Sequence, residues 1–124
     1  MARGYFLIVT ALLEVGAGLL LLAVPALALQ FLLGVGEAAS ETLVVARIAG
    51  AALLAIGVTC WMARRNGPNP AQSGVVAGAL IYDVAAAGLL AYAGLGLNMA
   101  GLGLWPAVGL HTVLAVWSVA CIRS

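Results

Sequence analysis

The sequence predicts an all-α integral membrane protein: a bundle of four transmembrane helices with both termini in the cytoplasm. Composition is the first indication. Hydrophobic residues make up 65% of the 124 residues and charged residues only 7%, whereas a soluble domain has about 25% charged residues. So few polar groups cannot cover a surface exposed to water, but lipid can solvate an apolar one. The length allows a single transmembrane domain over residues 1–124, with no separate soluble module.

Four long apolar runs are the second indication. Each is close to the ~20 residues that a helix needs to cross the hydrocarbon core of a bilayer. Helix is expected because backbone polar groups must be satisfied within the segment in lipid. Transmembrane strands are excluded because the apolar runs are continuous rather than alternating. The expected spans are residues 5–24, 42–62, 74–95 and 105–122.

The segments between the spans carry residues that end helices. Pro25 follows the first span, and the apolar piece 26–33 is expected to be either a short interfacial helix or a kinked continuation of that span. The only clearly hydrophilic loop, residues 63–73, contains Pro68 and Pro70, which separate the second span from the third.

Arginine placement predicts the orientation. Four arginines lie outside the spans: Arg3, Arg64, Arg65 and Arg123. With four spans, all of them fall on one side, whereas the other side carries Glu37 and Glu41. The positive-inside rule then places both termini in the cytoplasm. We therefore expect a multi-pass protein of the bacterial inner membrane, with the lipid bilayer as its surroundings.

Each apolar run carries one ionisable residue, namely Glu14, Arg47, Asp83 and His111. Such a group at bilayer depth costs roughly 2.5–3.5 kcal/mol unless it finds a partner or water. At 1.5 Å per residue, Glu14 and Asp83 lie about 14 Å inside the membrane, and Arg47 and His111 about 8–9 Å from its outer surface. All four fall between the midplane and the outer third, so we expect one shared polar site.

The chemistry of these side chains limits their pairing. A guanidinium stays charged in proteins, so Arg47 is expected to pair with Glu14 or Asp83. The remaining carboxylate then pairs with His111 or holds a proton. Two readings remain open: interhelical clamps, often worth about 0.6 kcal/mol each in membranes, or a ligand, proton or catalytic pocket that opens towards the outer half of the bilayer.

Two further polar residues are candidates for the same site. Thr10 lies four residues before Glu14 and therefore on the same helix face. Tyr82, next to Asp83, either supplies a hydroxyl group to the site or is a packing aromatic.

Five glycines are candidates for close helix packing. Gly16 and Gly18 would allow another helix or a ligand to approach the first span, and Gly50 would do the same on the second. Gly74 and Gly78 form a GxxxG motif, which is typical of close contact between membrane helices. We expect this motif to serve packing within the bundle rather than dimerisation.

Several other functions have little support in the sequence. The single histidine has no cysteine or carboxylate at ligand spacing, so no metal site and no cofactor are predicted. Cys60 and Cys121 are expected to be small buried hydrophobic residues, because the cytoplasmic side is normally reducing. With a net charge of +1, the chain has no basic surface for nucleic acid.

Parts of the chain resemble small bacterial membrane proteins of the DoxX-like kind. The resemblance extends over most of the chain and implies a four-helix membrane bundle. It implies no particular activity, although some proteins of that kind are linked to quinone-dependent or redox membrane complexes. The stretches that carry it are Glu14 with Gly16 and Gly18, residues 45–50, residues 61–65, and Trp105 and Pro106 with His111.

Two classes of function follow from these expectations. The first is an accessory or structural subunit of a larger membrane complex or a homo-oligomer, more readily than an enzyme, because the loops are short. A lipid-facing surface rich in small residues would favour this class. The alternative is a protein that binds a small apolar molecule, such as a quinone, isoprenoid or sterol-like lipid, in an intramembrane polar pocket, with proton transfer as a further option.

Overall fold

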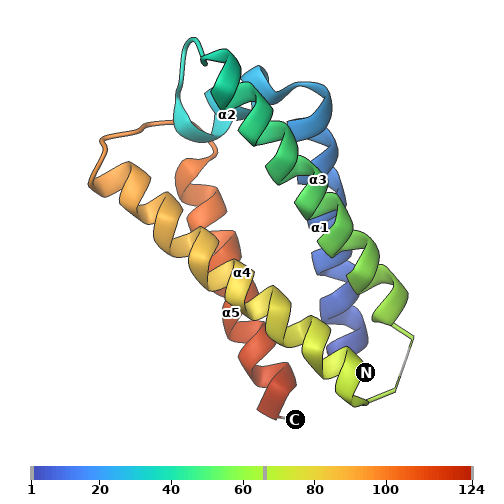
Figure 1. Cartoon of the computed structure of the whole chain (residues 1–124). Coiled ribbons are helices and arrows are strands. Elements are labelled where there is room, and N and C mark those ends of the chain that lie inside the picture. The colour runs from blue at the N-terminus through green and yellow to red at the C-terminus, as the bar shows by residue number, and fades with distance from the viewer. Residues whose placement is uncertain (1, 66, 124) are drawn as a thin grey trace.

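The computed structural model describes residues 2–65 and 67–123, and every regular element among them is an α-helix (Figure 1). The helices are α1 (Ala2–Ala23), α2 (Pro25–Leu33), α3 (Ser40–Ala63), α4 (Pro70–Leu95) and α5 (Leu104–Arg123). Four of them, α1, α3, α4 and α5, are long and apolar enough to cross a membrane. These helices confirm the all-helical prediction, and their length and composition suggest a multi-pass membrane protein.

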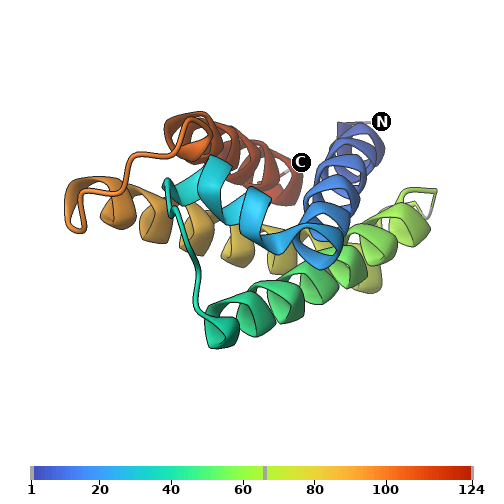
Figure 2. The same ribbon diagram turned by 90° about the horizontal axis from the view of Figure 1, so that it is seen from above.

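The short helix α2 follows directly from Pro25. Proline has no backbone N–H and clashes with the preceding turn, so α1 ends at Ala23 and Pro25 begins a new helix. This helix ends at Gly34, whose left-handed φ of 73° suits glycine and whose N–H donates to the Gln30 carbonyl. Figure 2 shows α2 lying across the end of the molecule. The apolar piece 26–33 is thus a helix of its own.

Helix α2 is fixed to the connection between α4 and α5. The Gly103 N–H donates to the Phe31 carbonyl at 2.9 Å. A Cβ atom at Gly101 would lie 2.3 Å from the Leu32 carbonyl carbon, so only glycine fits against the α2 backbone there. This connection therefore closes over the end of the molecule at which α2 lies.

The long helices pack chiefly as two pairs, α1 with α3 and α4 with α5 (Figures 1 and 2). In the first pair the backbones nearly touch, because a Cβ atom at Gly18 would lie 2.7 Å from the Gly50 carbonyl oxygen. A Cβ atom at Gly57 would likewise lie 2.9 Å from the Val15 nitrogen. Small residues allow this approach, as is usual for membrane helices.

The two pairs meet in a buried cluster that draws on all four long helices. The cluster includes Phe6, Cys60, Val76 and Leu114. Both cysteines, Cys60 and Cys121, are buried, as small hydrophobic residues would be. The cluster therefore joins the pairs towards the end of the molecule at which the termini lie.

Both termini lie at the same end of the molecule, together with the α3–α4 connection (Figure 1). Arg3 fixes this arrangement, because its Nε donates to the Cys121 carbonyl at 2.7 Å and its Nη1 to the Ser73 hydroxyl at 3.3 Å. The four arginines outside the predicted spans therefore lie at this end, whereas Glu37 and Glu41 lie at the end near α2.

Three of the five glycines predicted to pack do not do so. Gly18 and Gly50 contact each other across α1 and α3, but Cβ atoms at Gly16, Gly74 and Gly78 would meet no atom within 4 Å. The GxxxG motif of α4 therefore makes no close helix contact of the kind that Gly18 and Gly50 make, and Gly78 instead lines a groove between α3 and α4.

Candidate functional site

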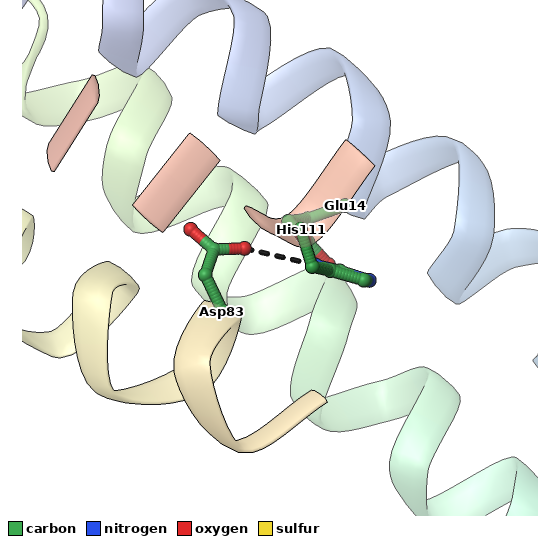
Figure 3. A group of neighbouring side chains, drawn as sticks. All are labelled: Glu14, Asp83 and His111. Atoms are coloured by element: carbon green, nitrogen blue, oxygen red, sulfur yellow. Dashed lines mark hydrogen bonds and ion pairs between the residues drawn. The ribbon is translucent and has the colours of Figure 1, made fainter. Parts of the chain in front are cut away.

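Three of the four ionisable residues predicted to meet do so, from three different helices. Glu14 lies on α1, Asp83 at the middle of α4 and His111 on α5 (Figure 3). One possible ligand atom from each side chain lies within 4.8 Å of the other two. Glu14 is 2% exposed and Asp83 is fully buried, whereas the His111 side chain keeps 12% of its surface exposed. His111 is therefore the accessible edge of the cluster.

Asp83 orients the imidazole ring. Its Oδ1 lies 2.9 Å from His111 Nδ1 (Figure 3). An ionised carboxylate can only accept hydrogen bonds, so this contact places a proton on Nδ1 and leaves Nε2 as the free position of a neutral ring. The Tyr82 ring packs edge-on against the imidazole at a centroid distance of 5.4 Å. Tyr82 therefore holds the ring from a second side.

Several polar atoms of this region have no partner within the described part of the chain. Asp83 Oδ2 and Thr10 Oγ1 are buried without a hydrogen bond there, and Glu14 forms no ion pair. Thr10 lies one turn from Glu14 on the same face of α1, as its spacing predicts. A buried polar atom without a partner costs about 1–3 kcal/mol, so these atoms favour a bound group that would satisfy them.

The prediction that Arg47 pairs with Glu14 or Asp83 is wrong. Arg47 is exposed, and its Nε donates to the Leu22 carbonyl at 3.2 Å. That carbonyl belongs to the last turn of α1, where carbonyl groups lack partners within the helix. Arg47 therefore stabilises the end of α1 and does not contribute to the cluster.

Without Arg47, the cluster holds two carboxyl groups and one imidazole but no guanidinium. Two carboxylates this close in a medium of low dielectric repel each other and lack solvation. The arrangement is therefore suited to taking up a cation, to holding protons, or to receiving the polar head of a ligand.

An apolar groove lies between α3 and α4, close to the cluster. It encloses about 290 Å³. One of its residues, Ala79, precedes Asp83 by one turn of α4, or about 6 Å along the helix. Its lining consists of Ala55, Ile56, Thr59, Cys60, Val75, Gly78 and Ala79. A second apolar groove of about 240 Å³ lies between α1 and α3, beside Trp61.

Sequence reasoning missed Gly57, which packs against Ala11 and Val15 as closely as Gly50 packs against Gly18. A signal was present, because Gly50 and Gly57 are seven residues apart and therefore share one helix face.

Comparisons with protein-family models, with curated proteins and with solved structures find no match to this chain.

Proposed function

We propose that this protein binds a small apolar molecule with a polar head, such as a quinone, isoprenoid or sterol-like lipid, inside a four-helix bundle of the bacterial inner membrane. The observation that carries the proposal is the convergence of Glu14, Asp83 and His111 from three helices. Ionisable residues inside membrane helices mark ligand or ion sites by default, because their insertion is costly.

The two parts of such a ligand correspond to two neighbouring features. A hydroxyl group of the head would donate a hydrogen bond to His111 Nε2 or to the Glu14 carboxylate, and a carbonyl oxygen would accept one from Glu14 when that carboxyl group holds a proton. His111 lies at the exposed edge of the cluster. The apolar part would lie in the groove between α3 and α4, which begins one turn from Asp83. The resemblance to DoxX-like proteins, some of them linked to quinone-dependent complexes, is compatible with this proposal.

Native mass spectrometry tests the proposal on protein gently extracted from its own membrane. We expect the chain to carry a small-molecule adduct that Glu14→Gln and Asp83→Asn lose by at least about tenfold, because each removes a charged acceptor from the head site. Glu41→Gln, which alters an exposed carboxylate outside the cluster, is the matched control and should keep the adduct. Circular dichroism would verify that all variants fold. An adduct that persists in both cluster variants, or its absence from the unaltered chain, would refute the proposal.

The exposed GxxxG face of α4 favours a second candidate, a subunit of a larger membrane assembly or a homo-oligomer. Gly74 and Gly78 are exposed, and a Cβ atom at either position would meet no atom within 4 Å. Such small-residue faces let a partner helix approach closely. In the same mass spectra, this candidate predicts a stable larger complex. Gly74→Leu should dissociate that complex, whereas Gly109→Leu, at an exposed and open position on α5, should not.

The proposed orientation has both termini in the cytoplasm, because four arginines lie at that end and Glu37 and Glu41 at the other. Gly36→Cys and Gly67→Cys form a matched pair, since both positions are exposed and open. A membrane-impermeant thiol reagent should label position 36 in cells with a permeable outer membrane, and position 67 only after lysis. The reverse pattern would invert the orientation.

A further inference from the structure

We propose that Glu14, Asp83 and His111 together hold a divalent transition-metal ion, with zinc as the best fit to the donor set. The inference concerns the cluster of the proposed function but does not require the apolar ligand. The sequence predicted no metal site because the three candidate ligands come from three helices, and spacing along the chain cannot show that they meet.

The geometry is close to that of a metal site. Bonds of about 2.0–2.2 Å from zinc to nitrogen and oxygen place neighbouring ligand atoms roughly 3–3.5 Å apart. Asp83 Oδ1 and His111 Nδ1, now joined by a hydrogen bond, are 2.9 Å apart, and a ligand atom from Glu14 lies within 4.8 Å of those of the other two residues. Metal binding at Nδ1 would break this hydrogen bond, and the imidazole proton would move to Nε2. A small rotation of the Glu14 side chain would therefore complete a three-ligand site.

Charge balance points to a dication. Arg47, the only arginine inside a predicted span, donates to the Leu22 carbonyl and does not reach the two carboxyl groups. A divalent ion would neutralise both carboxylates at once, and the imidazole would remain a neutral ligand. Such compensation matters at bilayer depth, where an uncompensated charge is costly.

The unpartnered atoms of the cluster are an independent indication of a missing group. Asp83 is fully buried, with no hydrogen bond to its Oδ2 from the described residues, and Glu14 is 2% exposed without an ion pair among them. These are two polar side chains, each more than nine-tenths buried, that lie beside a potential nitrogen ligand. A metal ion would supply the charge partner that Glu14 lacks, and Asp83 would satisfy its Oδ2 by binding the ion through both carboxylate oxygens.

The donor types select the class of metal. Imidazole suits zinc, copper, iron and nickel, whereas carboxylates alone would suit magnesium, calcium or manganese. Zinc sites with three protein ligands keep a fourth position open for water or another oxygen. In this chain that position would accept the head-group oxygen of the proposed ligand, and this last point alone rests on the proposed function.

The test uses the full chain, purified without a polyhistidine tag into lipid nanodiscs and stripped with a chelator. Co²⁺ serves as the spectroscopic probe, since its visible absorption reports nitrogen and oxygen ligands, and elemental analysis gives the stoichiometry. We expect one Co²⁺ per chain, displaced by Zn²⁺. Glu14→Gln and His111→Gln should each weaken binding by more than about 100-fold, beyond the 10–100-fold typical of residues outside the ligand shell.

Two controls make the result decisive. Glu37→Gln and Glu41→Gln remove exposed carboxylates outside the cluster and should leave Co²⁺ binding unchanged. Failure of the unaltered chain to bind Co²⁺ stoichiometrically would overturn the proposal, as would equal binding by the cluster variants. Mass spectra report the apolar ligand separately, so binding of metal without that ligand would reject the proposed function and leave the metal site standing.

Discussion

Replacing Gly18 with alanine is expected to lower the free energy of unfolding by about 1–3 kcal/mol, the usual cost of overpacking. The added Cβ atom would lie 2.7 Å from the Gly50 carbonyl oxygen and 2.8 Å from the Leu54 nitrogen. Both atoms belong to the backbone of α3, which cannot rotate aside as a flexible side chain can. Helices α1 and α3 would therefore have to separate, and denaturant titration in mixed micelles would measure the loss.

Gly16→Ala is the matched control, since Gly16 lies on the same helix and has no atom within 4 Å of its potential Cβ position. Alanine there should be neutral or should stabilise the helix by about 0.5–1 kcal/mol, because glycine is the poorer helix former. If both substitutions had the same effect on stability, the close packing of α1 on α3 at Gly18 would be disproved.

The second large effect concerns the Asp83–His111 pair. Asp83→Leu leaves the imidazole without its acceptor, and His111→Leu leaves a buried carboxylate without its donor. The double variant removes both groups, so it should be less destabilised than the sum of the single variants. We expect a coupling free energy of about 0.6–1.7 kcal/mol from a double-mutant cycle, which runs from the average to the maximum seen for hydrogen bonds between membrane helices.

Arg47 supplies the contrasting cycle. Because Arg47 is exposed and bonded to the Leu22 carbonyl, Arg47→Leu combined with Asp83→Leu should be additive within about 0.3–0.5 kcal/mol. A coupling between Arg47 and Asp83 as large as that between His111 and Asp83 would instead support the pairing predicted from sequence.

The sequence predicted the four long helices because hydropathy alone decides which segments cross a membrane. The helix ends were less predictable. The third span was expected to begin at Gly74, whereas α4 begins at Pro70. The Asn69 side chain accepts a hydrogen bond from the Gln72 N–H at 2.8 Å and caps the helix. This cap lies in a polar segment, which hydropathy assigns to the loop.

The sequence predicted the depth of the ionisable residues in the membrane but not the helix face on which each of them lies. Counting residues placed all four ionisable groups at a similar level, and three of them meet. Arg47 does not join the cluster because its side chain projects about 100° around α3 from that of its neighbour Ala46. Ala46 and Gly50 belong to the buried face of α3. Strongly apolar helices carry little sequence information about which side faces the bundle.

The same lack of information explains the GxxxG motif. Gly74 and Gly78 are four residues apart, as a packing face requires, but the motif does not specify the helix against which it packs. Among the described residues, neither glycine is in close contact with another helix. Packing inside the bundle and packing against a partner have the same local sequence signature, and only the tertiary arrangement separates them.

The most direct test of the intramembrane cluster uses the fact that the chain has one histidine. Selective ¹⁵N-histidine labelling then gives solid-state NMR signals from His111 alone, in lipid. We predict a short contact between Nδ1 and the Asp83 carboxyl carbon, and a change of the Nδ1 signal in Asp83→Asn but not in Glu41→Gln. Imidazole signals like those of a water-exposed histidine, unchanged by Asp83→Asn, would contradict the existence of the cluster.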